Sequence, residues 1–168
     1  MTVRAAAHAD DEAPHTLVVE RDVLAGMLLD PDDGIPRARA LLGPEAFHLD
    51  RHALVFKALC ALADRGEVAD LLTLTAQLER TGDLGAAGGH VALAHILEGA
   101  TTAANLAQHA ALVLEAYARR RLRRLALHVQ ARVADPTTDA KEVVACVSRE
   151  CAAVRVVLAR SEAARHVR

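Results

Sequence analysis

Five arginines within six positions give this sequence its densest charge, and guanidinium groups are good partners for phosphate or carboxylate oxygens. No acidic residue occurs between Glu115 and Asp135, so the local field is strongly positive. On a helix the five arginines spread around the surface. This is typical of a solvated face or of contact with acidic protein groups, including those in the first half of this chain. Phosphate contact is the alternative, although the sequence offers few aromatic residues to stack on single-stranded nucleic acid. The arginines are Arg119, Arg120, Arg121, Arg123 and Arg124.

The sequence contains no nucleotide-binding loop of the kind that ends in Gly-Lys-Ser or Gly-Lys-Thr, where the backbone amides and the lysine hold the phosphates. The two lysines, Lys57 and Lys141, do not follow a glycine. The glycine-rich stretch at residues 82–89 has no lysine after it, and its Asp83 would repel phosphate. We therefore predict that this chain has no ATPase site, needs no cofactor and is not an enzyme.

The nine histidines and three cysteines do not form a metal or catalytic pattern. His48 and His52 are four positions apart, but no third ligand lies at zinc spacing. Cys146 and Cys151 are five positions apart and diverge on a helix, so they cannot share a ligand. We expect packed, reduced thiols and no metal site.

The composition predicts that helices position all of these residues. Of the 168 residues 52% are hydrophobic, 25% are charged and only 2% are aromatic, so the core must be built from Leu, Val and Ala, and Ala has the highest helix propensity. We expect an all-α, cytoplasmic protein, because residues 1–13 lack the apolar core of a signal peptide and no apolar run approaches the ~18 residues of a membrane span.

The first half of the chain predicts a compact lobe of short helices. Asp50 is expected to cap the third of these helices, because its carboxylate can accept a free backbone N–H. Residues 1–13 are small, polar and charged, and we expect a flexible tail there. Apolar spacing and the Gly, Pro and Asp breaks place the helices at 16–29, 37–42, 50–64, 71–80 and 91–98.

The second half predicts a long antiparallel helical hairpin. Residues 103–133 contain no Gly or Pro, which predicts one long helix. A turn at Asp135 and Pro136 separates it from the last helix, which Asp139 and Glu142 are expected to begin with a capping box.

An apolar stripe runs along each helix of this hairpin. The step of five positions from Tyr117 to Leu122 predicts a stutter, with Leu122 turned inward beside the arginines. Val144, Val156 and Val157 flank the stripe of the last helix, so another surface is needed to bury them, either the lobe or a second copy. The residues expected to pack within the hairpin or between two hairpins are Val113, Tyr117, Leu122, Leu125, Val129, Val143, Val147, Val154 and Leu158.

The charge is divided between the two halves, although the net charge is only −2. Residues 1–100 hold 16 acidic and 8 basic residues, whereas residues 101–168 hold 6 acidic and 12 basic residues. Such a division indicates either nucleic-acid binding or complementary protein contact.

A series of landmarks extends from Pro14 to Asn105. It includes Glu20, Phe47, His52, Phe56, Arg65-Gly66, Asp70, Gly82, Gly88-Gly89 and Thr102-Ala103-Ala104-Asn105. Together these residues resemble the N-terminal domain of DnaB-type replicative helicases, standing alone without the ATPase domain. The resemblance implies a lobe at residues 14–101, a dimerising hairpin at 102–164 and a tail at 165–168, and it implies that His52 packs at a helix start.

The resemblance also implies a role in DNA replication. In this family the hairpins pair into dimers that assemble into a collar ring, and the domain binds primase. We therefore expect a non-catalytic interaction module whose partners are itself, primase or replicative helicase subunits, with nucleic acid second and no membrane. Two alternatives stay open: a small DNA-binding regulator that uses the arginines at 119–124, and a fragment of a split helicase gene.

Overall fold

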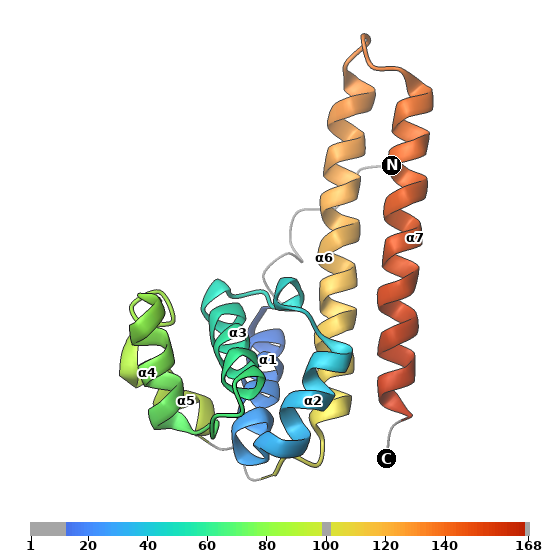
Figure 1. Ribbon diagram of the computed structural model, residues 1–168. Helices are drawn as coiled ribbons and strands as arrows, with labels where there is room; N and C mark the ends of the chain where they lie inside the picture. Colours follow the sequence, from blue (N-terminus) through green and yellow to red (C-terminus); the bar gives the residue numbers. More distant parts are fainter. Residues whose placement is uncertain (1–12, 99–101, 167–168) are drawn as a thin grey trace.

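The chain folds into a helical lobe from which a long two-helix hairpin projects (Figure 1). The computed structural model describes residues 13–98 and 102–166, and within these ranges it contains α-helices, one short 3-10 helix and no strand. The expected tails at 1–13 and 165–168 lie largely outside the described residues. The elements are α1 Ala13–Leu29, α2 Pro31–Leu41, η1 Pro44–Ala46, α3 Asp50–Asp64, α4 Leu71–Thr81, α5 Gly89–Leu97, α6 Leu106–Ala134 and α7 Ala140–Arg165.

Helix α1 is the centre of the lobe and contacts α2, α3, α5 and α6. Its residues Val23, Leu24 and Met27 are fully buried. Helices α4 and α5 lie at the end of the lobe farthest from the hairpin (Figure 1). The core is therefore a single apolar cluster that includes the lobe-facing side of α6.

Helices α1 and α2 cross closely because a glycine lies at the crossing. A Cβ on Gly34 would lie 2.7 Å from the carbonyl oxygen of Gly26 and 3.1 Å from Cα of Met27. The helix expected at 37–42 therefore begins six residues earlier, at Pro31, because residues 30–34, which resemble a turn in sequence, form its first turn. Asp30 instead caps α2, accepting from the backbone N–H of Asp33.

The cap expected at Asp50 is also wrong, since α3 begins at Asp50 itself and no side chain caps it. The capping box instead begins α4, where the carboxylate of Asp70 accepts from Thr73 N–H and Thr73 Oγ1 accepts from Asp70 N–H.

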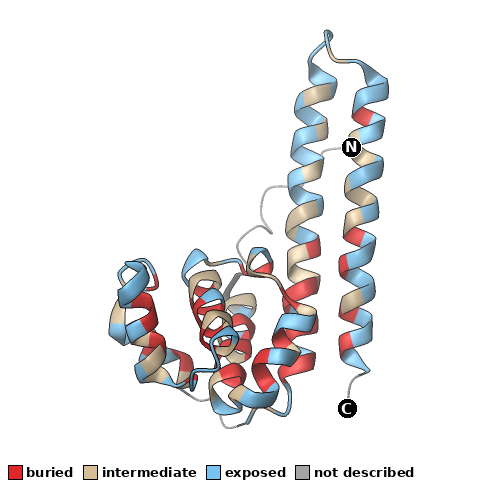
Figure 2. Ribbon diagram, viewed as in Figure 1, coloured by how far each residue is buried: buried red, intermediate tan, exposed pale blue. Residues whose placement is uncertain are grey.

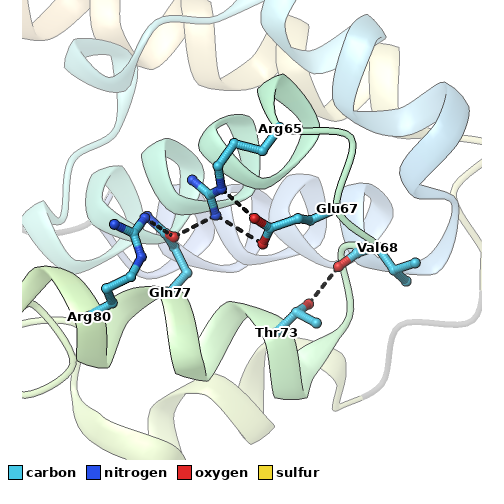
Figure 3. Close-up of polar contacts among 6 residues, drawn as sticks. All are labelled: Arg65, Glu67, Val68, Thr73, Gln77 and Arg80. Atoms are coloured by element: carbon cyan, nitrogen blue, oxygen red, sulfur yellow. Dashed lines mark hydrogen bonds and ion pairs between the residues drawn. The ribbon is translucent and has the colours of Figure 1, made fainter.

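A polar network fixes α4 against the end of α3 (Figure 3). The guanidinium of Arg65 pairs with Glu67 and donates to Gln77 Oε1 over 2.7 Å, and Arg80 donates to the same oxygen over 2.6 Å. The nearby Arg65 guanidinium lowers the pKa of Glu67. These contacts close the outer end of the lobe.

Helix α6 has two packing faces, one toward the lobe and one toward α7. Leu106, Ala110 and Val113 are buried in the lobe core. About a quarter turn away, Ala111 accepts a hydrogen bond from Ser161 Oγ of α7 over 2.9 Å. Figure 2 shows that burial is concentrated where α6 passes the lobe and decreases toward the far end of the hairpin.

The α6–α7 seam follows alternating steps of four and three residues, the spacing of a left-handed coiled coil. Ala118 and Arg121 keep this spacing unbroken between Leu114 and Leu125, so the stutter expected between Tyr117 and Leu122 is absent. Asp139 begins α7 by accepting from Lys141 N–H, without the capping box expected with Glu142. The seam consists of the buried or half-buried Ala107, Ala111, Leu114, Ala118, Arg121 and Leu125 of α6 and Val143, Val147, Glu150, Val154, Val157, Ser161 and Ala164 of α7.

Candidate functional site

The junction between lobe and hairpin is built on a buried carboxylate, Glu20 of α1, which is fully buried. It accepts hydrogen bonds from the backbone N–H of His48 and, over 3.5 Å, from that of Leu49. Nδ1 of His52 lies 2.8 Å from Oε2 of Glu20, the oxygen that also accepts from Leu49, and Nδ1 is the donor because a carboxylate can only accept. Glu20 therefore holds the loop that leads into α3, and His52 packs at the start of that helix.

Arg120 closes this junction from the hairpin side. Its guanidinium donates to the carbonyl oxygen of Ala46, in the same loop that Glu20 holds. Burial lowers the pKa of Arg120, and the charge of Glu20 opposes that effect. Arg120 is thus part of the fold and is poorly placed to contact a ligand.

The other arginines of the cluster divide into two groups. Arg121 forms a 2.6 Å ion pair with Glu150 of α7, and Arg119 forms a 2.8 Å pair with Glu115 one turn earlier. These acidic partners belong to the hairpin, whereas the lobe acts on the cluster through Arg120, which the charge of Glu20 reaches. Arg123 and Arg124 are exposed and make no ion pair among the described residues.

Tyr117 lies beside these arginines at the edge of the lobe. The guanidinium carbons of Arg120 and Arg121 each lie 5.8 Å from the centroid of its ring, which is within cation–π range. A groove on the same side of the hairpin is lined by Tyr117, Arg121, Arg124 and His128. The basic cluster therefore combines an aromatic ring with positive charge, although the ring is half-buried.

The structure divides the expected hairpin-packing residues among three environments. Val113 and Tyr117 face the lobe, and Leu125, Val129, Val143, Val147 and Val154 lie along the α6–α7 seam or at its edge. Leu122 and Leu158 are exposed, so the expectation that Leu122 points inward is wrong for the single chain. Val157, expected beside the stripe, is buried in the seam in place of Leu158.

One side of the hairpin, turned away from the lobe, is apolar and is not covered by any residue that the structure describes. We name it the far face. Because α6 and α7 are antiparallel, helical spacing brings residues from both helices to this side. Leu122 is 42% exposed, Val133 69% and Val144 65%. The far face consists of Leu122, Val129 and Val133 of α6 and Val144 and Cys151 of α7.

Sequence reasoning did not identify Glu20 as the central residue of the junction. Its signal was an acidic residue three and four positions before Val23 and Leu24, a spacing that places its carboxylate on the same helix face as these apolar residues. A buried carboxylate requires partners, so this pattern predicts hydrogen-bond donors nearby.

The thiols and histidines do not converge on a reactive centre within residues 13–98 and 102–166. Burial raises the pKa of Cys60 to about 11, which makes it a poor nucleophile at neutral pH. No cluster of three or more His, Cys, Asp or Glu that could bind a metal is found in the described part of the chain. Among the described helices, none combines the length and the apolar character that crossing a bilayer requires.

This architecture matches a known family. A sequence profile of the DnaB-like helicase N-terminal domain matches residues 12–115, which span the lobe and the first part of α6. The chain belongs to this family. The family resemblance and the all-α fold predicted from the sequence are thereby confirmed.

The DnaB-like domain is similar to the start of much longer helicases. The chain is 38% identical over 137 residues to the replicative DNA helicase DnaB of Rhodothermus marinus, covering 82% of this chain and 14% of that protein. It is 36% identical over 116 residues to the DnaB of Geobacillus stearothermophilus, covering 69% of this chain and 25% of that protein. The chain therefore spans a quarter or less of the length of these two relatives.

Solved structures of DnaB-like proteins share the same arrangement of helices. The crystal structure of the N-terminal domain of DnaB helicase from Mycobacterium tuberculosis aligns with a TM-score of 0.72 at 34% identity, covering 80% of this chain and 94% of that chain. A structure of a DnaB-like replicative helicase, described with its interactions with primase, shares the fold at a TM-score of 0.56 and 20% identity, covering 85% of this chain and 30% of that chain.

Proposed function

We propose that this chain is a non-catalytic docking and self-association module of the DNA replication machinery. Membership of the DnaB-like N-terminal domain family carries the proposal, because the matched region covers the lobe and the base of the hairpin. The partners we propose are a second copy of the chain, the N-terminal collar of the replicative helicase, and primase.

The far face of the hairpin supports the self-association part of this role. It is an exposed apolar strip on an otherwise charged hairpin, and such strips are typical of protein–protein contacts. A second hairpin of the same kind, whether from another copy or from a helicase collar, has the shape to cover it.

The primase part of the proposal is supported by fold likeness alone. The helicase structure that shares this fold is described together with its interactions with primase. Primase is therefore the heterologous partner to test first, and the lobe is available to it when the far face is covered.

A pull-down with the full chain as bait tests the proposal, using purified helicase and purified primase from the same host in separate reactions. We expect one or both to be retained at micromolar concentration. A matched pair of variants sharpens the test. Leu122→Asp with Val144→Asp alters the far face, whereas Leu127→Asp with Val156→Asp places the same charges on other exposed hairpin positions. Retention of neither protein at micromolar concentration would remove the proposal.

A second candidate, a small DNA-binding regulator, is favoured by the exposure of Arg123 and Arg124. It predicts duplex binding that weakens steeply as salt rises. A mobility-shift assay with Arg123→Glu and Arg124→Glu tests it, with Arg155→Glu, which lies elsewhere on α7, as the control. Arg120→Glu is a poor probe, because Arg120 supports the lobe–hairpin junction. Equal binding by all three variants would exclude the cluster as a DNA site.

A further inference from the structure

A groove on the lobe, away from the hairpin, lies where α1, α3 and α5 meet. It encloses about 300 Å³, and apolar side chains such as Leu17, Val55 and Ile96 line it. Val55 and Ile96 belong to the buried core, so the floor is a fixed surface of well-packed helices. The groove can therefore receive an aliphatic side chain without rearrangement of the lobe.

Two arginines line this groove. No carboxylate is among its lining residues, but its two histidines contact glutamates beyond the lining, His52 with Glu20 and His95 with Glu98. Arg21 and Arg51 line it from α1 and α3, together with His52 and His95. Nε of Arg21 is buried without a hydrogen-bond partner in the described structure, and the carboxylate of Asp22 is 3.9 Å from its guanidinium. Arg51 is exposed and makes no ion pair with any described residue. Two guanidinium groups are thus left with unused hydrogen-bonding capacity above an apolar floor.

We propose that this groove binds an acidic peptide segment of a partner protein, with a carboxylate on Arg21 and Arg51 and a neighbouring aliphatic side chain on the floor. Guanidinium groups match carboxylates in geometry as well as charge. Nucleic acid fits less well, because no Phe, Tyr or Trp lines the groove for a base to stack on.

This inference rests on the docking role proposed above and names one surface for it. The groove and the far face of the hairpin lie on different parts of the molecule, so a partner peptide and a second copy need not compete. The two proposals can therefore fail separately, because the groove assay uses a short peptide and depends neither on self-association nor on helicase or primase.

The groove is tested on the full chain by fluorescence anisotropy with a short labelled peptide. The glutamate and leucine residues of this peptide are spaced so that they lie on one face of a helix. Arg21→Glu with Arg51→Glu is expected to weaken binding about tenfold or more, because two charge-assisted contacts become repulsive. Arg155→Glu with Arg123→Glu, which makes the same change of charge on the hairpin, is the matched control and is expected to leave binding within about twofold. The same peptide with glutamine for glutamate is expected to bind at least about tenfold more weakly.

Amide chemical-shift mapping locates the bound peptide. Shifts confined to residues around Leu17, Arg51 and Ile96 support the groove. Equal weakening by the groove and control variants, or shifts on the hairpin, overturns the proposal in favour of general charge attraction. Groove shifts that grow with protein concentration in the absence of peptide also overturn it, because a second copy is then the occupant. Absence of binding at millimolar peptide overturns it outright.

Discussion

At the scale of single residues, Glu20 shows how one buried charge can set a local structure. Its carboxylate satisfies two backbone N–H groups at the entry to α3 and fixes the tautomer of His52. Arg120 is close enough for its charge to interact with Glu20, and it contacts the same loop from α6. A loop that would otherwise expose unpaired donors in the core is thereby held between α1 and the hairpin.

Replacing Glu20 with glutamine is expected to destabilise the fold by about 2 kcal/mol, because the amide brings a donor toward groups that already donate. Urea unfolding monitored by circular dichroism measures this loss. Glu79→Gln on the exposed side of α4 is the control and is expected to change the free energy of unfolding by less than about 0.5 kcal/mol. Equal effects of the two variants would show that the Glu20 contacts contribute nothing specific.

Cys60 provides a residue-scale prediction about pH. Burial raises the pKa of its thiol to about 11, whereas the charge of Arg39 opposes the shift. The reactive thiolate is thus a small fraction at neutral pH and grows about tenfold per pH unit. We expect the rate of alkylation by iodoacetamide at Cys60, followed by peptide mass mapping, to keep rising through pH 9 and 10. A free-cysteine peptide, with its pKa near about 8.5, is expected to level off there. A plateau for Cys60 near pH 9 would contradict the assignment.

At the scale of elements, the α6–α7 seam shows why the hairpin was harder to predict than the lobe. Most lobe helices are bounded by Gly, Pro and Asp residues that have strong local preferences, and their positions follow from the sequence. In the seam, Ala111 and Ala118 are buried while the larger Leu122 is exposed. Small side chains let the helices approach closely, but a search for large apolar residues does not detect them.

Charged residues also make the seam hard to predict from the sequence. Arg121 and Glu150 occupy seam positions and pair across it, although both residue types usually indicate an exposed face. The paired geometry depends on the register of α7, which no local pattern in α6 encodes. For the same reason Glu20 was missed, because its donors are separated from it by more than a dozen residues along the chain.

The register of α7 can be tested with two adjacent valines. Val157 is 7% exposed and packs in the seam, whereas Val156 is 61% exposed. Val157→Asp places an unpaired carboxylate in the seam and is expected to cost about 3 kcal/mol, while Val156→Asp is expected to change stability by less than about 0.5 kcal/mol. Thermal unfolding at low protein concentration compares them. A larger loss for Val156→Asp would mean that the helix packs through the other face.

At the scale of the whole molecule, the lobe and the hairpin bury their apolar residues to different extents. The lobe buries its residues in one cluster, and the base of the hairpin shares that cluster. Beyond the lobe, α7 is the one described element that covers α6, and apolar residues of the outer hairpin are exposed (Figure 2). Ion pairs such as that of Arg132 with Glu142 join α6 to α7 at the edge of the hairpin, but they do not cover the far face.

This imbalance predicts self-association through the hairpin. Light scattering at ~100 µM is expected to give the mass of a dimer or larger assembly, since a 17.9 kDa chain with an uncovered strip gains by burying it in a second copy. Leu122→Asp with Val144→Asp is expected to weaken association about hundredfold or more, because two carboxylates would be buried without partners. Circular dichroism is expected to stay unchanged, because both side chains are largely exposed in the single chain.

The matched variant, Leu127→Asp with Val156→Asp, adds the same charge to exposed hairpin positions that lie outside the far face. It is expected to keep the mass of the unmodified chain, because those side chains stay in solvent when two far faces meet. A strictly monomeric mass for the unmodified chain at this concentration contradicts self-association itself. Equal dissociation by both pairs contradicts the far face as its location, since net charge alone would then separate the copies.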